Sequence, residues 1–140
     1  MRVLGIDYGD ARVGLALSDT LGLTASPLPY LSAKDEKVLF ARLNDIIDKN
    51  EVKKIVLGFP KNMNGTVGER GEVTLNFYEK LKGRCGVPVV LWDERLTTVS
   101  AERVLNETNV RGQKRKARID SLSAVFILEN FLNGNFLNND

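Results

Sequence analysis

An aspartate closes the first apolar run of this sequence, where a charge is costly. Val3, Leu4 and Ile6 have the pattern of a buried strand, and Asp7 follows them just before a Tyr-Gly pair. A carboxylate at the end of a core strand costs several kcal/mol unless it is paired, hydrogen-bonded or bound to a cation. Asp7 is therefore either a cap of the turn that follows, a metal ligand or part of a phosphate cradle.

Three further acids are candidates to share a site with Asp7. Asp93 and Glu94 follow the last apolar strand, and Asp120 lies at the start of a strongly apolar helix. Each has a simpler reading, as polar residues that end a strand or as a helix cap. Clustered carboxylates repel one another, and a bound cation relieves that repulsion. Two metal ions about 4 Å apart, held by such a cluster, can activate water and stabilise the leaving oxygen in phosphodiester cleavage.

The composition limits the chemistry of any such site. The chain has no histidine and one cysteine, Cys85. Ser-His-Asp and Cys-His catalysis and most zinc sites are thereby excluded, and a metal must be held by oxygen atoms. That donor set points to a hard cation, Mg²⁺ or Mn²⁺. The lone cysteine also excludes an internal disulfide, which is typical of the reducing cytoplasm.

Positive charge is concentrated in one segment. Residues 111–118 contain five basic and no acidic residues; since the whole chain has a net charge of +2, the rest sums to −3. Charge runs are usually solvated surface, but this one directly precedes Asp120, so we predict that it contacts phosphate groups. Arg12 and Arg95, close to the acids, can neutralise a phosphate or pair with carboxylates. The predicted phosphate contacts are Arg12, Arg95, Arg111, Lys114, Arg115, Lys116 and Arg118.

The elements that must position these residues follow a mixed α/β pattern. Three antiparallel strands open the chain, and the two prolines of the third make it an edge or irregular strand. Right-handed crossovers place the later strands parallel to the first, so that Asp7 and the Asp93-Glu94 pair end on one edge of the sheet. The expected strands are 2–7, 12–18, about 23–31, 54–59 and 87–92, and the expected helices are 35–49, 66–82, 97–109 and 119–132.

Length and hydropathy are those of one ordinary domain. A chain of 140 residues is long enough for one core and too short for two, so we expect a single domain over residues 1–140. No apolar run approaches the roughly 18 residues that span a bilayer, and no secretory signal opens the chain. We therefore expect a cytoplasmic protein with no membrane partner. Gly65, Gly68 and Gly71 flank a helix start, where they serve either a phosphate or the geometry and packing of the loop.

Four strings of the sequence resemble the YqgF family, also called RuvX-like. They are GIDYGDARVGLALSD, GFPKNMNGTVGERG, DERLTTVSA and DSLSAVFILE, in the family's order and over nearly the whole chain. The resemblance implies an RNase H-like fold whose metal-binding acids come from the first strand, the DER motif and the last helix. These positions correspond to Asp7, Asp93-Glu94 and Asp120. Within the DER motif we favour Glu94 as the ligand, by similarity to related RNase H-fold enzymes.

The predicted function is a divalent-metal-dependent endonuclease with Asp7, Asp93, Glu94 and Asp120 as catalytic acids. The resemblance implies two substrates, precursor small-subunit ribosomal RNA and branched DNA such as a Holliday junction, and does not choose between them. A resolvase would need two sites, hence a homodimer, whereas RNA trimming can use a monomer. A non-catalytic nucleic-acid-binding factor is the main alternative. An actin-like phosphotransferase is disfavoured because such enzymes clamp nucleotide between two duplicated domains.

Overall fold

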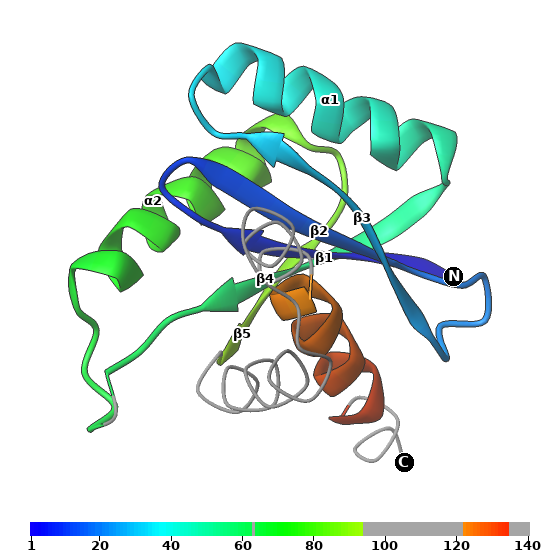
Figure 1. Cartoon of the computed structure of the whole chain (residues 1–140). Helices are drawn as coiled ribbons and strands as arrows, with labels where there is room; N and C mark the ends of the chain where they lie inside the picture. Colours follow the sequence, from blue (N-terminus) through cyan, green and yellow to red (C-terminus); the bar gives the residue numbers. More distant parts are fainter. Residues whose placement is uncertain (63, 94–121, 135–140) are drawn as a thin grey trace, which may run out of the picture.

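The computed structural model describes residues 1–62, 64–93 and 122–134. Its centre is a five-stranded sheet in the order β3-β2-β1-β4-β5 (Figure 1). The first three strands are antiparallel, and β4 and β5 run parallel to β1, as predicted. The strands are β1 (Arg2–Tyr8), β2 (Arg12–Ser18), β3 (Ala25–Ser32), β4 (Val52–Phe59) and β5 (Val89–Asp93).

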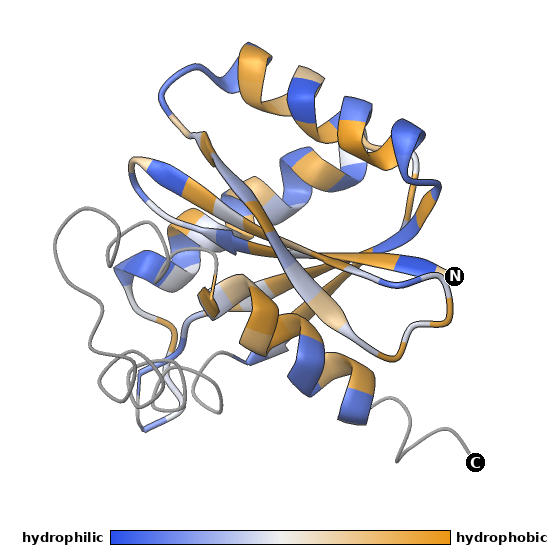
Figure 2. Cartoon of the chain, turned by 45° about the vertical axis from the view of Figure 1, so that its right-hand side comes forward, coloured by the Kyte–Doolittle hydropathy of each residue, from blue (hydrophilic) through white to orange (hydrophobic). Residues whose placement is uncertain are grey.

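Helices cover both faces of the sheet. α1 (Glu36–Lys49) and α2 (Glu69–Arg84) lie on one face, and the chain is helical again over residues 122–134, here called the C-terminal helix, on the other (Figure 1). The C-terminal helix is largely apolar, as its colouring shows (Figure 2). The sequence predicts it as an element buried against the sheet, and Ala124, Ile127 and Leu128 are fully buried. None of the helices in the described ranges is long and apolar enough to cross a membrane.

The alternation of side chains along β1 divides the core in two. Leu4 and Ile6 face α1 and α2, where they pack in a cluster of buried aliphatic and aromatic residues. Val3 faces the C-terminal helix, and so does Gly5, where a Cβ atom would lie 2.9 Å from Leu128 Cβ. Gly5 is therefore required by the close approach of the helix. Odd-numbered residues of β1 belong to the face of the C-terminal helix.

The helix boundaries differ slightly from the predicted ones. α1 begins at Glu36, one residue after the expected start, and Asp35 caps it by accepting hydrogen bonds from the backbone N–H groups of Lys37 and Val38. The predicted start of the next helix at Thr66 is wrong, because α2 begins at Glu69. The Thr66 hydroxyl is instead bonded to side chains of the preceding loop, so it is not available to cap a helix.

One face of α2 is only partly buried. Val73, Phe77 and Leu81 lie at helical spacing along α2, and Phe77 and Leu81 are buried. Val73 is 37% exposed and lies at the rim of a pocket instead. Cys85, which follows α2, is buried, and burial raises the pKa of its thiol, so it has little thiolate character.

Candidate active site

Asp7 lies at the carboxyl edge of the sheet, on the face of the C-terminal helix. It is the penultimate residue of β1, which ends at Tyr8, one residue later than predicted. Asp7 pairs with Gly14 of β2. Because Ile6 pairs with Leu57 of β4, the residue of β4 next to Asp7 is Gly58. The half-buried carboxylate is thus flanked in the sheet by two residues without side chains.

The turn after Asp7 is built around Gly9. The Gly9 N–H donates to the carbonyl oxygen of Arg12 at 2.9 Å, and a Cβ atom at Gly9 would lie only 2.6 Å from that oxygen. Only glycine fits so close a backbone approach. This tight hairpin fixes the direction in which β1 ends, and with it the position of Asp7.

Arg70, near the start of α2, contacts the hairpin turn that follows Asp7. Its Nη2 donates to the carbonyl oxygen of Tyr8 at 2.6 Å, and its Nη1 forms an ion pair with Asp10. Sequence reasoning missed this residue. Its only signal was a place in the string GFPKNMNGTVGERG, since a contact across 62 positions leaves no local pattern.

Arg12 lies on the same face of the sheet as Asp7. Along β2, Val13 and Leu15 face α1 and α2, so Arg12 belongs to the opposite face with Gly14 and Ala16. Its guanidinium carbon lies 5.0 Å from the centre of the Tyr30 ring, a cation–π contact that orients the side chain. Arg12 is therefore close to Asp7 in the sheet, as the sequence indicated. The side chains of Arg12 and Asp7 belong to the same face, that of the C-terminal helix.

Asp93 ends β5 on the same edge of the sheet as Asp7 but on the other face. The preceding Trp92 packs against the C-terminal helix: its Nε1 donates to Asn130 Oδ1 at 3.0 Å, and its ring meets Phe131 edge-on with centroids 5.4 Å apart. Asp93 therefore points the opposite way, beside its partner Phe59, the residue of β4 that faces α2. The predicted shared edge is observed, whereas a shared face is not.

The other candidate residues lie outside the described ranges, as does the expected helix 97–109. Within those ranges, no three Asp, Glu, Cys or His residues gather to form a metal site. Asp7 does offer the anionic oxygen donor that a hard cation requires, in register with Gly14 of β2 and beside Gly58 of β4. The candidates outside the description are Glu94, Arg95, Arg111, Lys114, Arg115, Lys116, Arg118 and Asp120.

Gly65, Gly68 and Gly71, in the loop before α2 and in its first turn, have geometric roles. Gly65 has a φ of 86°, which favours glycine. Gly68 is the N-cap of α2, and a Cβ atom there would lie 3.2 Å from Asn62 Oδ1. At Gly71 a Cβ atom would be 2.6 Å from Val67 Cγ1 and 3.0 Å from a backbone carbonyl oxygen. The conformation of Gly65 and the tight packing at Gly68 and Gly71 therefore support the geometric one of the two predicted roles.

Comparisons with known proteins decide the family. The model of the family described as "RuvX: Holliday junction resolvase" matches residues 1–134. The chain belongs to the RuvX family. This membership, inferred from the four sequence strings, makes the chain a nuclease-family protein.

Similar curated proteins carry a name that concerns RNA. A protein of Lachnospira eligens is 47% identical over 135 residues, covering 94% of this chain and 96% of its own, and one of Bacillus subtilis is 48% identical over 134 residues, covering 94% and 97%. Both are named as proposed nucleases of pre-16S rRNA. Relatives of this RuvX-family chain therefore match it over nearly their whole length.

Solved structures show the fold. RuvC of Thermus thermophilus, in complex with a Holliday junction, superposes with a TM-score of 0.62 at 16% identity and covers 99% of this chain and 97% of its own. The Fowlpox virus Holliday junction resolvase gives 0.57 at 13% identity and covers 96% and 99%. The RuvX-family chain thus has the RNase H-like resolvase fold that the sequence predicted.

Proposed function

We propose that the chain is a divalent-metal-dependent endonuclease that cleaves precursor 16S ribosomal RNA. The observation that carries the proposal is the half-buried Asp7 carboxylate between Gly14 and Gly58, at the edge where parallel strands end. The names of relatives at 47–48% identity support RNA as the substrate. Branched DNA is the second candidate, favoured by the description of the family and by the resolvase fold.

The proposed metal ligands are Asp7, Glu94 and Asp120. Glu94 is preferred to Asp93 because Asp93 lies on the face of α2, away from Asp7. Mg²⁺ or Mn²⁺ held by these oxygens would activate a water molecule and stabilise the leaving oxygen. Asp93 is then not a metal ligand in this proposal. It has another role at the end of β5, where it pairs with Phe59.

Positive side chains hold the substrate in this proposal. Arg12, on the face of Asp7, would neutralise the phosphate at the acid site. Arg95 would do so from the DER motif, and the basic residues of 111–118 would contact the backbone without reading bases. Trimming of RNA requires a single site, so we propose that a monomer in the cytoplasm suffices.

The experiment is a cleavage assay of the full chain on four labelled substrates. These are precursor 16S rRNA, mature 16S rRNA, a four-way DNA junction and the matching linear duplex, each with Mg²⁺, Mn²⁺ or a chelator. We expect metal-dependent cleavage of the precursor only. Cleavage of the junction alone would replace RNA by DNA as the substrate, and no cleavage of any substrate would favour a binding factor. Asp45→Asn, which alters an exposed acid of α1, is the matched control for Asp7→Asn.

A further inference from the structure

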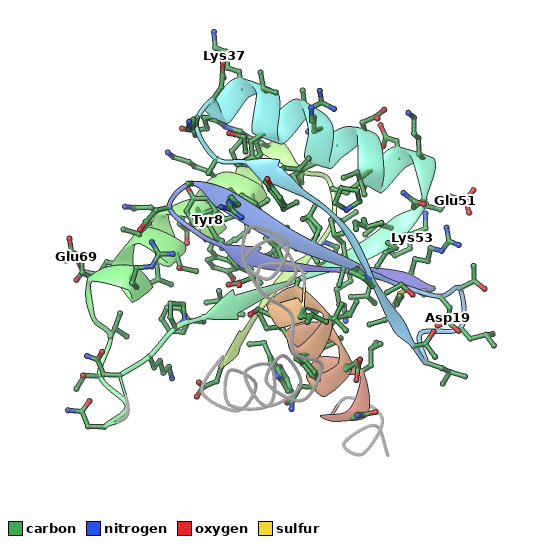
Figure 3. All side chains as sticks on the ribbon, in the orientation of Figure 1. Tyr8, Asp19, Lys37, Glu51, Lys53 and Glu69 are labelled. Carbon is green, nitrogen blue, oxygen red and sulfur yellow. The ribbon has the colours of Figure 1, made fainter. Side chains whose placement is uncertain are left out.

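A pocket of about 260 Å³ opens at the edge of the sheet where β1 and β3 end, between the start of α1 and the middle of α2. Tyr8 lies beside α2 in this region (Figure 3). The volume is slightly below the roughly 300–1,000 Å³ of typical small-molecule sites, so it suits a flat group of one or two rings. The lining that matters here, called the Tyr8 pocket, is Tyr8, Lys34, Glu36, Asn76, Phe77 and Lys80.

One wall of the Tyr8 pocket is a fixed aromatic ring. Tyr8 stacks on Phe77 with ring centroids 4.0 Å apart and planes 13° apart. Phe77 is only 4% exposed and also contacts Phe40, with centroids 5.6 Å apart, so the core holds the stack in place. A flat aromatic ligand that extends this stack meets a surface whose orientation is already set.

The rim of the pocket offers both donors and an acceptor. Glu36 is paired with two cations, since its Oε1 lies 3.1 Å from Lys80 Nζ and 3.2 Å from Arg84 Nη1, and its Oε2 accepts a hydrogen bond from Lys80 Nζ at 3.2 Å. Oε1 is buried, but the side chain as a whole is 43% exposed, and one carboxylate oxygen can accept a second hydrogen bond, so Oε2 can receive a donor from a ligand. Lys34 and Asn76 are exposed and present donors at the mouth.

We infer that the Tyr8 pocket holds one unpaired nucleobase of the substrate, with an exocyclic amino group directed at Glu36. An aromatic platform with hydrogen-bonding groups at its edge is how proteins read bases in single-stranded RNA. The rim carries charges of both signs, so the stacked rings of Tyr8 and Phe77 are the feature that favours a base over the backbone. This inference rests on the proposed function, and it makes an unpaired nucleotide part of the recognised substrate.

The position of the pocket relative to Asp7 supports this reading. Tyr8 follows Asp7 directly, and the two side chains leave the strand on opposite faces. An RNA strand whose backbone crosses the carboxyl edge of the sheet can therefore place a phosphate at Asp7 and turn a nearby base over that edge into the Tyr8 pocket. A nucleotide held in a continuous duplex cannot do this without leaving its stack.

Binding in the presence of a chelator tests the inference apart from cleavage. Fluorescence anisotropy gives the affinities of labelled single-stranded octamers of A, C or U and of an abasic octamer, for wild type, Tyr8→Leu and Tyr8→Phe. We expect Tyr8→Leu to reduce the preference for A8 over the abasic octamer by roughly 5–100-fold, the range for one stacked base. Tyr8→Phe should retain that preference. Glu36→Gln should reduce the preference for C8 over U8.

Exposed positions keep the inference testable if Tyr8→Leu fails to fold. Asn76→Ala should lower the preference for bases over the abasic octamer by roughly 2–10-fold, the effect of removing one hydrogen bond. Lys34→Ala should weaken binding of A8 more than the control Lys37→Ala, which alters an exposed lysine outside the pocket lining. If Tyr8→Leu, or Asn76→Ala in its place, leaves the preference for bases unchanged, the pocket holds no base.

The two proposals fail in different ways. If wild type cleaves precursor RNA with Mg²⁺ while the variants show unchanged base preference, the pocket inference is overturned and the nuclease proposal stands. If the variants lose base preference but wild type cleaves nothing, the pocket belongs to a binding protein and the nuclease proposal is overturned.

Discussion

Arg70 donates a hydrogen bond to the carbonyl oxygen of Tyr8 across 2.6 Å, from the first turn of α2 to the last residue of β1. The same guanidinium pairs with Asp10 on the far side of Gly9. The turn that follows Asp7 is thus held at two points by one side chain from another element. A planar guanidinium makes these contacts with two separate nitrogen atoms in a fixed geometry, whereas an ammonium would have to reach both acceptors from one nitrogen atom.

Arg70→Lys should reduce cleavage by roughly ten- to a hundredfold, the cost of a small misplacement of a catalytic group. Stability should change by no more than about 1 kcal/mol, because the ion pair with Asp10 is largely exposed. The diagnostic readout is the Mg²⁺ concentration for half-maximal activity, which should rise if Arg70 positions Asp7. Arg42→Lys, at an exposed position of α1, is the control. Equal Mg²⁺ responses in both variants would assign Arg70 to stability alone.

Asp7→Asn should abolish metal-dependent cleavage while the fold is preserved. Asparagine keeps the shape and hydrogen bonding of the side chain but lacks the charge that holds a cation. The loss of a group that acts in the transition state costs several powers of ten in rate. Rates come from single-turnover cleavage, and circular dichroism reports the fold. Wild-type rates in Asp7→Asn would leave Asp7 as a turn residue.

The two acids of the DER motif should respond differently to neutralisation. Glu94→Gln is expected to lose activity nearly as fully as Asp7→Asn, whereas Asp93→Asn should keep at least about a tenth of it, because Asp93 lies on the face of α2. The comparison uses the same cleavage assay at saturating Mg²⁺. The reverse order of effects would contradict the assignment of faces along β5.

Replacing Lys114, Arg115 and Lys116 together with Ala should weaken binding to unrelated RNA sequences to a similar degree. The slope of log affinity against log salt should fall by roughly 0.7 for each phosphate of a single strand that the variant no longer neutralises. Affinities measured in chelator at four salt concentrations give this slope. Lys37→Ala, Arg42→Ala and Lys49→Ala together, all at exposed positions of α1, are the control for the loss of three positive charges. A triple variant with the slope of wild type would mark residues 111–118 as solvated surface.

The free energy of unfolding should depend on pH through Asp19, which directly follows β2. Its Oδ1 accepts hydrogen bonds from the backbone N–H of Leu23 at 2.7 Å and of Thr24 at 3.2 Å, and these bonds lower its pKa below 3.8. A depressed pKa in the folded state contributes stability that is present above pH 3.8 and is lost as the pH falls through the folded value. Asp19→Asn should therefore destabilise at pH 7 and much less near pH 3. Urea unfolding at both values, with Asp45→Asn as control, measures the difference.

The parts of the fold that the sequence predicts are those encoded locally. The apolar run of Val3, Leu4 and Ile6 predicts β1 because a buried strand is specified by neighbours a few residues away. The predicted helix start at Thr66 is wrong because a hydroxyl that can cap a helix can equally bond within a loop. Here the Thr66 hydroxyl bonds to the side chains of Asn62 and Asn64. Local preference does not distinguish the two uses.

The candidate site depended on relationships that no local pattern carries. The crossovers predicted that Asp7 and Asp93 share an edge, since parallel strands end together. Their separation onto two faces follows from the register of β5, which one residue of offset reverses. Arg70 donates its hydrogen bond to the Tyr8 carbonyl oxygen where α2 passes the edge of the sheet, and the Tyr8 pocket lies in the same region. Both depend on contacts between residues far apart in the sequence, so only the structure reveals them.

The packing of the C-terminal helix on Val3, Gly5 and Val56 has a consequence for synthesis on the ribosome. The strand that carries Asp7 leaves the ribosome well before the helix that packs against it. Until that helix emerges, the apolar residues that it covers are exposed on the nascent chain. A chain released before the helix is made would therefore carry Asp7 on a strand that lacks this packing.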